Sequence, residues 1–219
     1  MREVESCLLR YNSDMNSLSD VGQEKRRNKA FALGDARVQE IITIAKNHTY
    51  TKNYKADEYK LYKPYKNQIL KETGNNKEMA IVIGKDNKVV FEKLGGESSV
   101  MFTEAECNMM KGNKLIHNHP SGSTLSFQDV MLAVQKGLTE IIAFSGKGTY
   151  YRLIIKSNKN INELVLKYKE AQIEASAVIR KLVETEVFTR TQGTLEYHHF
   201  IMSIFSNSTK DIYYEQTKH

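Results

Sequence analysis

Apolar residues follow a helical period toward both ends of the chain. From residue 23 to 47 they recur at intervals of three and four among charged side chains, which predicts a helix interrupted near Gly34. A shorter helix is predicted from Val4 to about Tyr11, before a Ser/Asn/Asp-rich break. A long helix is predicted again from Asn160 to about Glu186, followed by a tail from Thr189.

The middle of the chain instead carries short β-branched runs that are typical of strands. The runs MAIVIG and KVVFEK, which begin at Met79 and Lys88, flank a polar turn and predict a β-hairpin. Further extended pieces are predicted in SSVMF, KLIHNH, EIIAFS and TYYRLII. Helices are predicted after Thr103, which has capping-box spacing to Glu106, and after Ser126. This alternation predicts an α/β (α+β) fold in which a mixed sheet is flanked by helices.

Three regions follow from these patterns. Residues 1–77 are expected to form a helical N-terminal extension with a Tyr/Lys-rich connector, residues 78–157 the α/β domain, and residues 158–219 a C-terminal helix and tail. The connector holds five tyrosines interleaved with lysines between Tyr50 and Tyr65. Such a segment could stack on nucleic-acid bases, but without a glycine-rich strand motif we expect it to pack on the domain.

The composition of the chain limits which partners, cellular location and metal ligands are expected. The net charge of +6 is mild and dispersed, so it does not by itself indicate a nucleic-acid partner. No apolar run is long enough to span a bilayer and no signal peptide is apparent, so a cytoplasmic protein without membrane contact is expected. Cys7 and Cys107 are isolated, which excludes a thiolate zinc cluster. A metal in this chain would have to be held by histidine and carboxylate.

The segment from His117 to Asp129 has the residue types and spacing of such a metal site. His117 and His119 lie two residues apart on a predicted strand, so their imidazoles point the same way. Asp129 lies three residues after Ser126 near the start of the next helix, where both can face the end of that strand. Two imidazoles and one carboxylate would hold one Zn²⁺ with a fourth position open for water. Each residue alone also has an ordinary structural explanation, such as a helix N-cap for Ser126.

The pattern His117-x-His119-Pro120 followed by Ser126-x-x-Asp129 resembles the JAMM motif of the JAB/MPN metalloprotease family. HNHPSG is more narrowly similar to the RadC-type branch and to JAB-like domains of bacteriophage proteins. The resemblance covers about Glu78 to Lys156.

The resemblance implies a JAB/MPN-like fold, a zinc-activated water, an upstream glutamate that serves as general base, and a serine that stabilises the oxyanion. The matching serine is Ser126. The glutamate is expected to be Glu92, at the end of KVVFEK, with Glu97 as the main alternative and Glu104 as a further one.

The leading functional hypothesis is therefore a zinc peptidase or isopeptidase acting on a protein or peptide, for example at the tail of a ubiquitin-like protein. One alternative is a phage structural or assembly module whose helical extensions bind other proteins. Another is a RadC-like nucleic-acid-associated protein. His198 and His199 are adjacent and so diverge, which predicts surface or core histidines rather than a second metal site.

Overall fold

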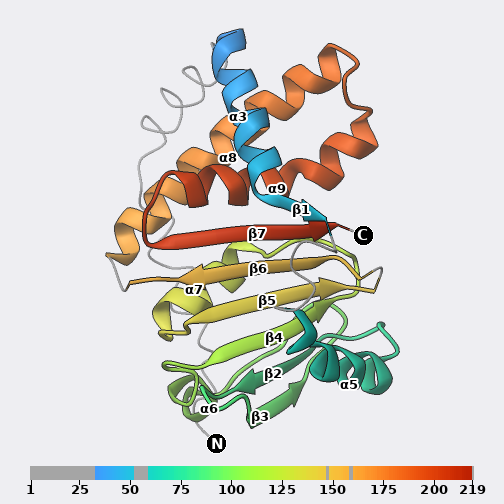
Figure 1. Cartoon of the computed structure of the whole chain (residues 1–219), viewed down its shortest axis with the longest axis vertical. Helices are drawn as coiled ribbons and strands as arrows, with labels where there is room; N and C mark the ends of the chain where they lie inside the picture. The colour runs from blue at the N-terminus through green and yellow to red at the C-terminus, as the bar shows by residue number, and fades with distance from the viewer. Residues whose placement is uncertain (1–32, 52–58, 147, 158–159, 219) are drawn as a thin grey trace, which may run out of the picture.

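A computed structural model describes residues 33–51, 59–146, 148–157 and 160–218. The described residues form a seven-stranded mixed sheet flanked by helices (Figure 1), which confirms the predicted α/β class. The strands are β1 (Thr49–Thr51), β2 (Met79–Ile83), β3 (Val89–Leu94), β4 (Lys114–His119), β5 (Glu140–Ser145), β6 (Tyr150–Ile155) and β7 (Ile212–Lys218). The helices are α3 (Asp35–Asn47), α5 (Lys63–Thr73), α6 (Glu104–Asn108), α7 (Phe127–Gln135), α8 (Ile161–Glu184) and α9 (Arg190–Asn207).

The strand order places β4 well inside the sheet. The order is β1-β7-β6-β5-β4-β2-β3. The pairs β4 with β5 and β1 with β7 are parallel, whereas the other neighbours are antiparallel. A parallel pair needs a crossover connection, and α7 supplies it between β4 and β5. This crossover brings the N-terminus of α7 close to the end of β4.

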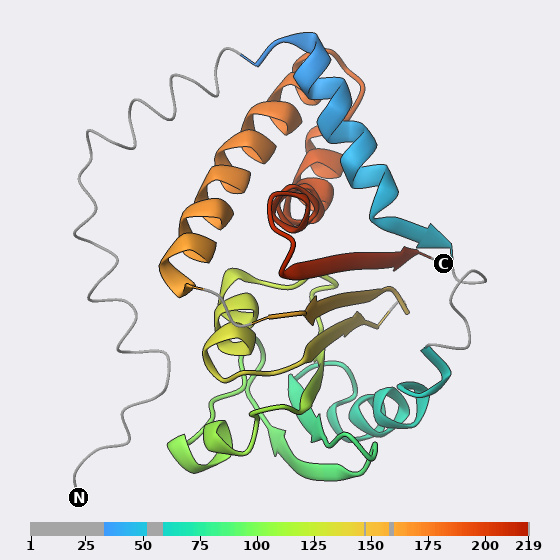
Figure 2. The ribbon, with the colours of Figure 1, turned by 60° about the vertical axis from the view of Figure 1, so that its left-hand side comes forward.

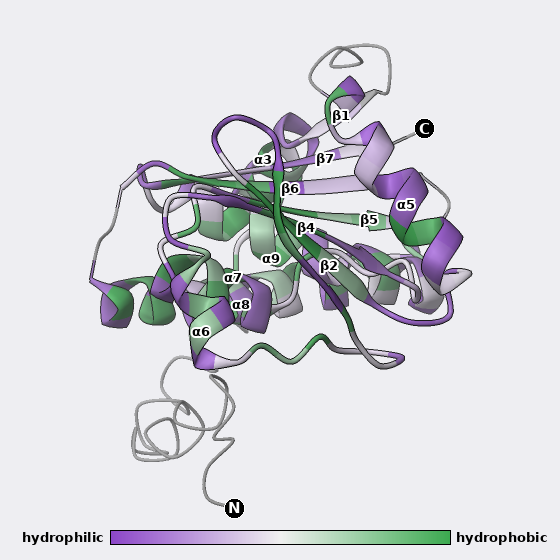
Figure 3. Cartoon of the chain, turned by 90° about the horizontal axis from the view of Figure 1, so that it is seen from below, coloured by the Kyte–Doolittle hydropathy of each residue, from purple (hydrophilic) through white to green (hydrophobic). Residues whose placement is uncertain are grey.

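The two faces of the sheet bury different cores (Figure 3). On one face, residues of α3, α7, α8 and α9 pack with side chains such as Ala80 and Leu115. On the opposite face, α5 packs with Tyr59 and Tyr62 over side chains such as Ile81 and Ile116. Because successive side chains of a strand alternate between faces, the face of any residue on β2, β3 or β4 follows from the register.

The regions predicted as extensions complete the same sheet. β7, at the C-terminal end of the chain, pairs with β6 from Tyr150 opposite Thr217 to Ile155 opposite Ile212. β1 then pairs with β7 at the edge. Helices α3, α8 and α9 gather near these strands (Figure 2). The described residues on either side of 78–157 thus contribute strands and covering helices to one sheet.

Several predicted elements differ in detail. The helix expected over residues 23–47 is observed from Asp35, after Gly34 as N-cap, and its first part lies outside the described residues. The helix expected from Val4 to Tyr11 also lies outside them. The extended piece predicted in SSVMF is irregular, and the tail predicted from Thr189 contains α9 and β7. Among the described residues, no helix combines the length and apolar character needed to cross a membrane.

A charged network lies on the face that α5 covers. Arg152 of β6 forms ion pairs with Glu140 of β5 and Glu215 of β7. The hydroxyl groups of Tyr62 and Tyr59 donate hydrogen bonds to Glu140 and Glu215, at 2.9 and 3.0 Å. Tyr59 and Tyr62 of the Tyr/Lys-rich segment therefore pack on the sheet.

We expect Arg152→Met to destabilise the fold strongly, because Glu140 and Glu215 are 5% and 0% exposed and would lose a shared cation. Removing one partner from a buried ion pair costs about 3–5 kcal/mol, measurable by urea unfolding. Lys181→Met is the matched control, since its ion pair with Asp35 is exposed and solvent screens such pairs. Equal unfolding free energies in the two variants would contradict a stabilising role for the Arg152 network.

Candidate metal centre

The two histidines project from the buried strand β4. His117 pairs with Ala80 of β2 and with Ala143 of β5, so it points to the face that α7 covers. His119, two residues later, shares that face. Their side chains are buried, and the two Nε2 atoms lie 2.9 Å apart. The predicted orientation of the histidine pair is therefore observed.

Asp129 reaches the histidines from the first turn of α7. Ser126 is the N-cap of this helix, and a capping box joins it to Asp129. The Ser126 hydroxyl and backbone N–H both donate to Asp129 Oδ2 at 2.7 Å, while the Asp129 N–H donates to Ser126 Oγ at 3.1 Å. These bonds occupy Oδ2 and leave Oδ1 facing His117.

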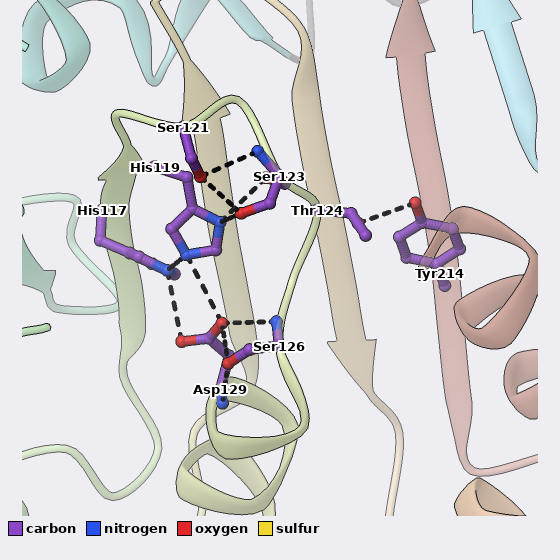
Figure 4. Close-up of polar contacts among 8 residues, drawn as sticks. All are labelled: His117, His119, Ser121, Ser123, Thr124, Ser126, Asp129 and Tyr214. Atoms are coloured by element: carbon purple, nitrogen blue, oxygen red, sulfur yellow. Dashed lines mark hydrogen bonds and ion pairs between the residues drawn. The ribbon is translucent and has the colours of Figure 1, made fainter. Parts of the chain in front are cut away.

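The three side chains converge on one point (Figure 4). Asp129 Oδ1 lies 3.3 Å from His117 Nε2, and Oδ2 lies 3.5 Å from His119 Nε2. Tetrahedral zinc with bonds of roughly 2.0–2.2 Å places its ligand atoms roughly 3.3–3.6 Å apart. The His117 nitrogen lies within this range of Oδ1 and the His119 nitrogen within this range of Oδ2, whereas the two imidazole nitrogens would need to part by a few tenths of an ångström. The group could therefore hold a metal ion.

The charges within this group are strongly coupled. Burial alone would raise the pKa of Asp129, but the charges of His117 and His119 and the hydrogen bonds hold that pKa well below its usual range. Burial would lower the pKa of His117, yet the Asp129 carboxylate raises it above the ordinary value. Burial and the neighbouring His117 both lower the pKa of His119. His119 Nδ1 also bonds the Ser123 carbonyl at 2.9 Å, which directs its Nε2 lone pair toward the group.

A cavity of about 470 Å³ opens beside the histidines and contains a further carboxylate, Glu78. Glu78 immediately precedes β2 and lies on the same face as Ala80, the residue paired with His117. Its backbone is fixed by hydrogen bonds with Gly95 and Gly96. Burial raises the pKa of Glu78 and is the largest influence on it. The charge of His117 acts to lower this pKa, and the charge of Asp129 acts to raise it further. Glu78 is thus the acidic residue that shares the cavity with the three candidate ligands.

The structure does not bring Glu92 to this site. Glu92 pairs with Ile81, whose side chain lies in the core beneath α5, so Glu92 projects from the opposite face to His117. It is exposed and accepts a hydrogen bond from Gln68 of α5. Glu97 and Glu104 are also exposed and do not line the cavity. The prediction that Glu92 lies beside the histidines is therefore wrong, and the glutamate that lines their cavity is Glu78.

Asn118 connects the metal group to Glu78 and was not singled out in the sequence. Its side chain points away from the histidines and is fully buried. Asn118 Oδ1 accepts a hydrogen bond from the Met79 N–H, and Nδ2 donates to the Lys77 carbonyl, both at 2.9 Å. The two backbone groups flank Glu78, so the residue between the ligands fixes the segment that carries the carboxylate.

His199 is a core residue, as predicted, and takes no part in the metal group. It is 3% exposed and bonds Tyr214 and the Ala45 carbonyl.

Comparison of the chain with protein-family models, curated proteins and solved structures finds no match. The chemistry of this chain is therefore argued from its own geometry.

We expect the purified protein to bind one divalent metal ion per chain, for which Zn²⁺ is the probe, because one ion satisfies the three converging ligand atoms. Zinc at a hundredfold excess over its Kd would add about 2.7 kcal/mol to the free energy of unfolding. Elemental analysis and thermal unfolding measure both effects. His119→Ala should abolish them, whereas His198→Ala, which changes an exposed histidine, should not. Equal zinc content in both variants would contradict this site.

Proposed function

We propose that this protein is a zinc-dependent peptidase or isopeptidase of the JAMM type, which hydrolyses an amide bond in a protein or peptide substrate. The observation that carries the proposal is the placement of Glu78 in the same cavity as His117, His119 and Asp129. Two histidines and one carboxylate are a ligand set found in hydrolytic zinc sites, and a separate carboxylate nearby is the group that such hydrolysis needs for proton transfer.

Each residue has a defined task in the proposed reaction. A zinc ion held by His117, His119 and Asp129 would supply Lewis-acid activation of water and of the amide carbonyl. Glu78 accepts a proton from the attacking water and returns it to the leaving amine. A carboxylate whose pKa is raised by burial suits both halves of that transfer. The Ser126 hydroxyl is engaged by Asp129, so we assign Ser126 to holding that ligand rather than to the oxyanion.

The walls of the cavity favour a neutral substrate. Apolar side chains, among them Val100, Phe102 and Leu132, form part of the lining, and serines form another part. No lysine or arginine is among the described residues that line it. Phosphodiester substrates are normally held by such cations, whereas a peptide needs apolar contacts and a few polar groups. This supports an amide substrate over a nucleic acid.

The alternative functions draw less support from the described residues. Tyr59 and Tyr62 are buried against the sheet, so they are not available to stack on bases. Helices α8 and α9, which an assembly module would use to dock partners, pack extensively on each other and contribute to the core of the sheet. Tight assembly through these helices in a protein that binds no zinc would favour the assembly module.

The decisive comparison is Glu78→Gln against Glu92→Gln. Removing a general acid–base group lowers the rate by about 10²–10⁴-fold, so we expect this loss for Glu78→Gln with zinc still bound. Glu92→Gln should leave the rate unchanged, because Glu92 lies on the other face of the sheet. A screen of ubiquitin-like fusions and peptides identifies the substrate and supplies the assay. Full activity of Glu78→Gln, or equal losses in both variants, would overturn the assignment of the base.

A further inference from the structure

The loop from His119 to Ser126 joins the two elements that carry the candidate ligands. Its Ser123 carbonyl bonds His119 Nδ1 at 2.9 Å, and its last residue, Ser126, caps the helix that bears Asp129. The orientation of the His119 ring therefore depends on where this loop holds Ser123. A change in loop position would move the ligand atom without removing any ligand.

Two tyrosines of the sheet bind this loop on either side of Ser123. The Tyr151 hydroxyl of β6 donates to the Gly122 carbonyl at 3.0 Å. The Tyr214 hydroxyl of β7 forms a hydrogen bond with Thr124 Oγ1 at 3.1 Å (Figure 4). Gly122 has a positive φ of 79°, a conformation that glycine adopts without strain. The bonded residues immediately precede and follow the carbonyl that orients His119.

Both tyrosines stand on strands that fix their position. Tyr214 pairs with Leu153, two residues from Tyr151, so the two rings share one face of adjacent strands. Tyr214 is fully buried, and its hydroxyl also lies 3.1 Å from His199 Nδ1 of α9. His199 Nε2 in turn lies 3.1 Å from the Ala45 carbonyl at the end of α3. The contact at Thr124 is thereby connected to both segments that flank residues 78–157.

We infer that Tyr151 and Tyr214 are positioning residues of the metal centre, which set the orientation of His119 through the loop. This inference rests on the proposed zinc site. Groups that orient a metal ligand from behind typically change metal affinity or activity by 10- to 100-fold when they are removed. The C-terminal strand β7 then contributes to metal binding through the bond between Tyr214 and Thr124, which Figure 4 shows.

The test measures zinc affinity and the visible spectrum of the Co²⁺-substituted protein in full-length variants. Tyr214→Phe keeps the ring and removes the hydroxyl, and Thr124→Val removes the same bond from the loop side while the bond of Tyr214 to His199 remains. We expect each to weaken zinc binding by about tenfold and to shift the Co²⁺ bands. Because both variants remove the bond between Tyr214 and Thr124, the loss of zinc affinity in the double variant should be no more than the larger of the two single losses.

Tyr213→Phe is the matched control. Tyr213 is the neighbouring residue of β7, and its hydroxyl bonds Tyr50 at 2.9 Å rather than the loop. It should retain wild-type zinc affinity and the wild-type Co²⁺ spectrum, even if it lowers the unfolding temperature. A general loss of stability would affect Tyr213→Phe and Tyr214→Phe alike and leave the spectrum of the folded protein unchanged.

The results separate the two proposals. If the wild-type protein binds no zinc, the proposed function itself fails. If it binds zinc, but Tyr214→Phe and Thr124→Val bind as tightly with an unchanged Co²⁺ spectrum, the positioning role is overturned and the metal site stands. Additive losses in the double variant would also overturn the claim that the bond between Tyr214 and Thr124 transmits the effect.

Discussion

The carboxylate of Asp129 lies beside two buried imidazoles, and its charge has to be stabilised where little water reaches it. Its side chain is 17% exposed, and burial of an unpaired carboxylate would cost several kcal/mol. Ser126, the N-cap of α7, donates its N–H and O–H to Oδ2, and the helix dipole favours negative charge at this end. The parallel pair of β4 and β5 requires a crossover, and α7 is that crossover. The helix end therefore comes to lie opposite His117 and His119.

The helices outside residues 78–157 hold this arrangement in place. Phe127, the first residue of α7, packs on Tyr168 of α8 at 4.8 Å between ring centroids, and Tyr168 packs on Phe205 of α9 at 5.3 Å. The N-terminus of α7 is thus supported by aromatic packing while its preceding loop is bonded to β6 and β7. The described residues outside 78–157 therefore extend the sheet and support the site.

The parts of the site that could be predicted from the sequence are those that depend on local geometry. The alternation of a strand places His117 and His119 together, and capping-box spacing places Asp129 in the first turn of a helix. The prediction that Glu92 lies at the site was wrong because the face to which Glu92 points depends on the register between β3 and β2. One residue along β3 changes the face, and Glu92 lies opposite Ile81 rather than Ala80.

The C-terminal elements were missed for a different reason. From His199 to Ser206 every residue of α9 is buried, so no amphipathic stripe marks the helix. In β7, Glu215 and Gln216 are buried polar residues, which conceal a strand pattern that depends on apolar alternation. The Glu215 carboxylate is there because Arg152 lies on the adjacent strand, and that pairing joins residues far apart in sequence.

The three residues His117, Asn118 and His119 show how one strand positions both the candidate metal ligands and the proposed base, Glu78. Alternation sends the histidines toward α7 and the asparagine toward the opposite face, where its amide bonds the backbone on both sides of Glu78. A shift of β4 relative to β2 would therefore move the candidate metal ligands and break the bonds that fix Glu78, the proposed base. The position of Glu78, the proposed base, relative to the candidate ligands therefore depends in part on the pairing of β4 with β2, which a rigid sheet maintains better than a loop would. The same pairing explains why Glu78 can lie outside any motif visible around the histidines.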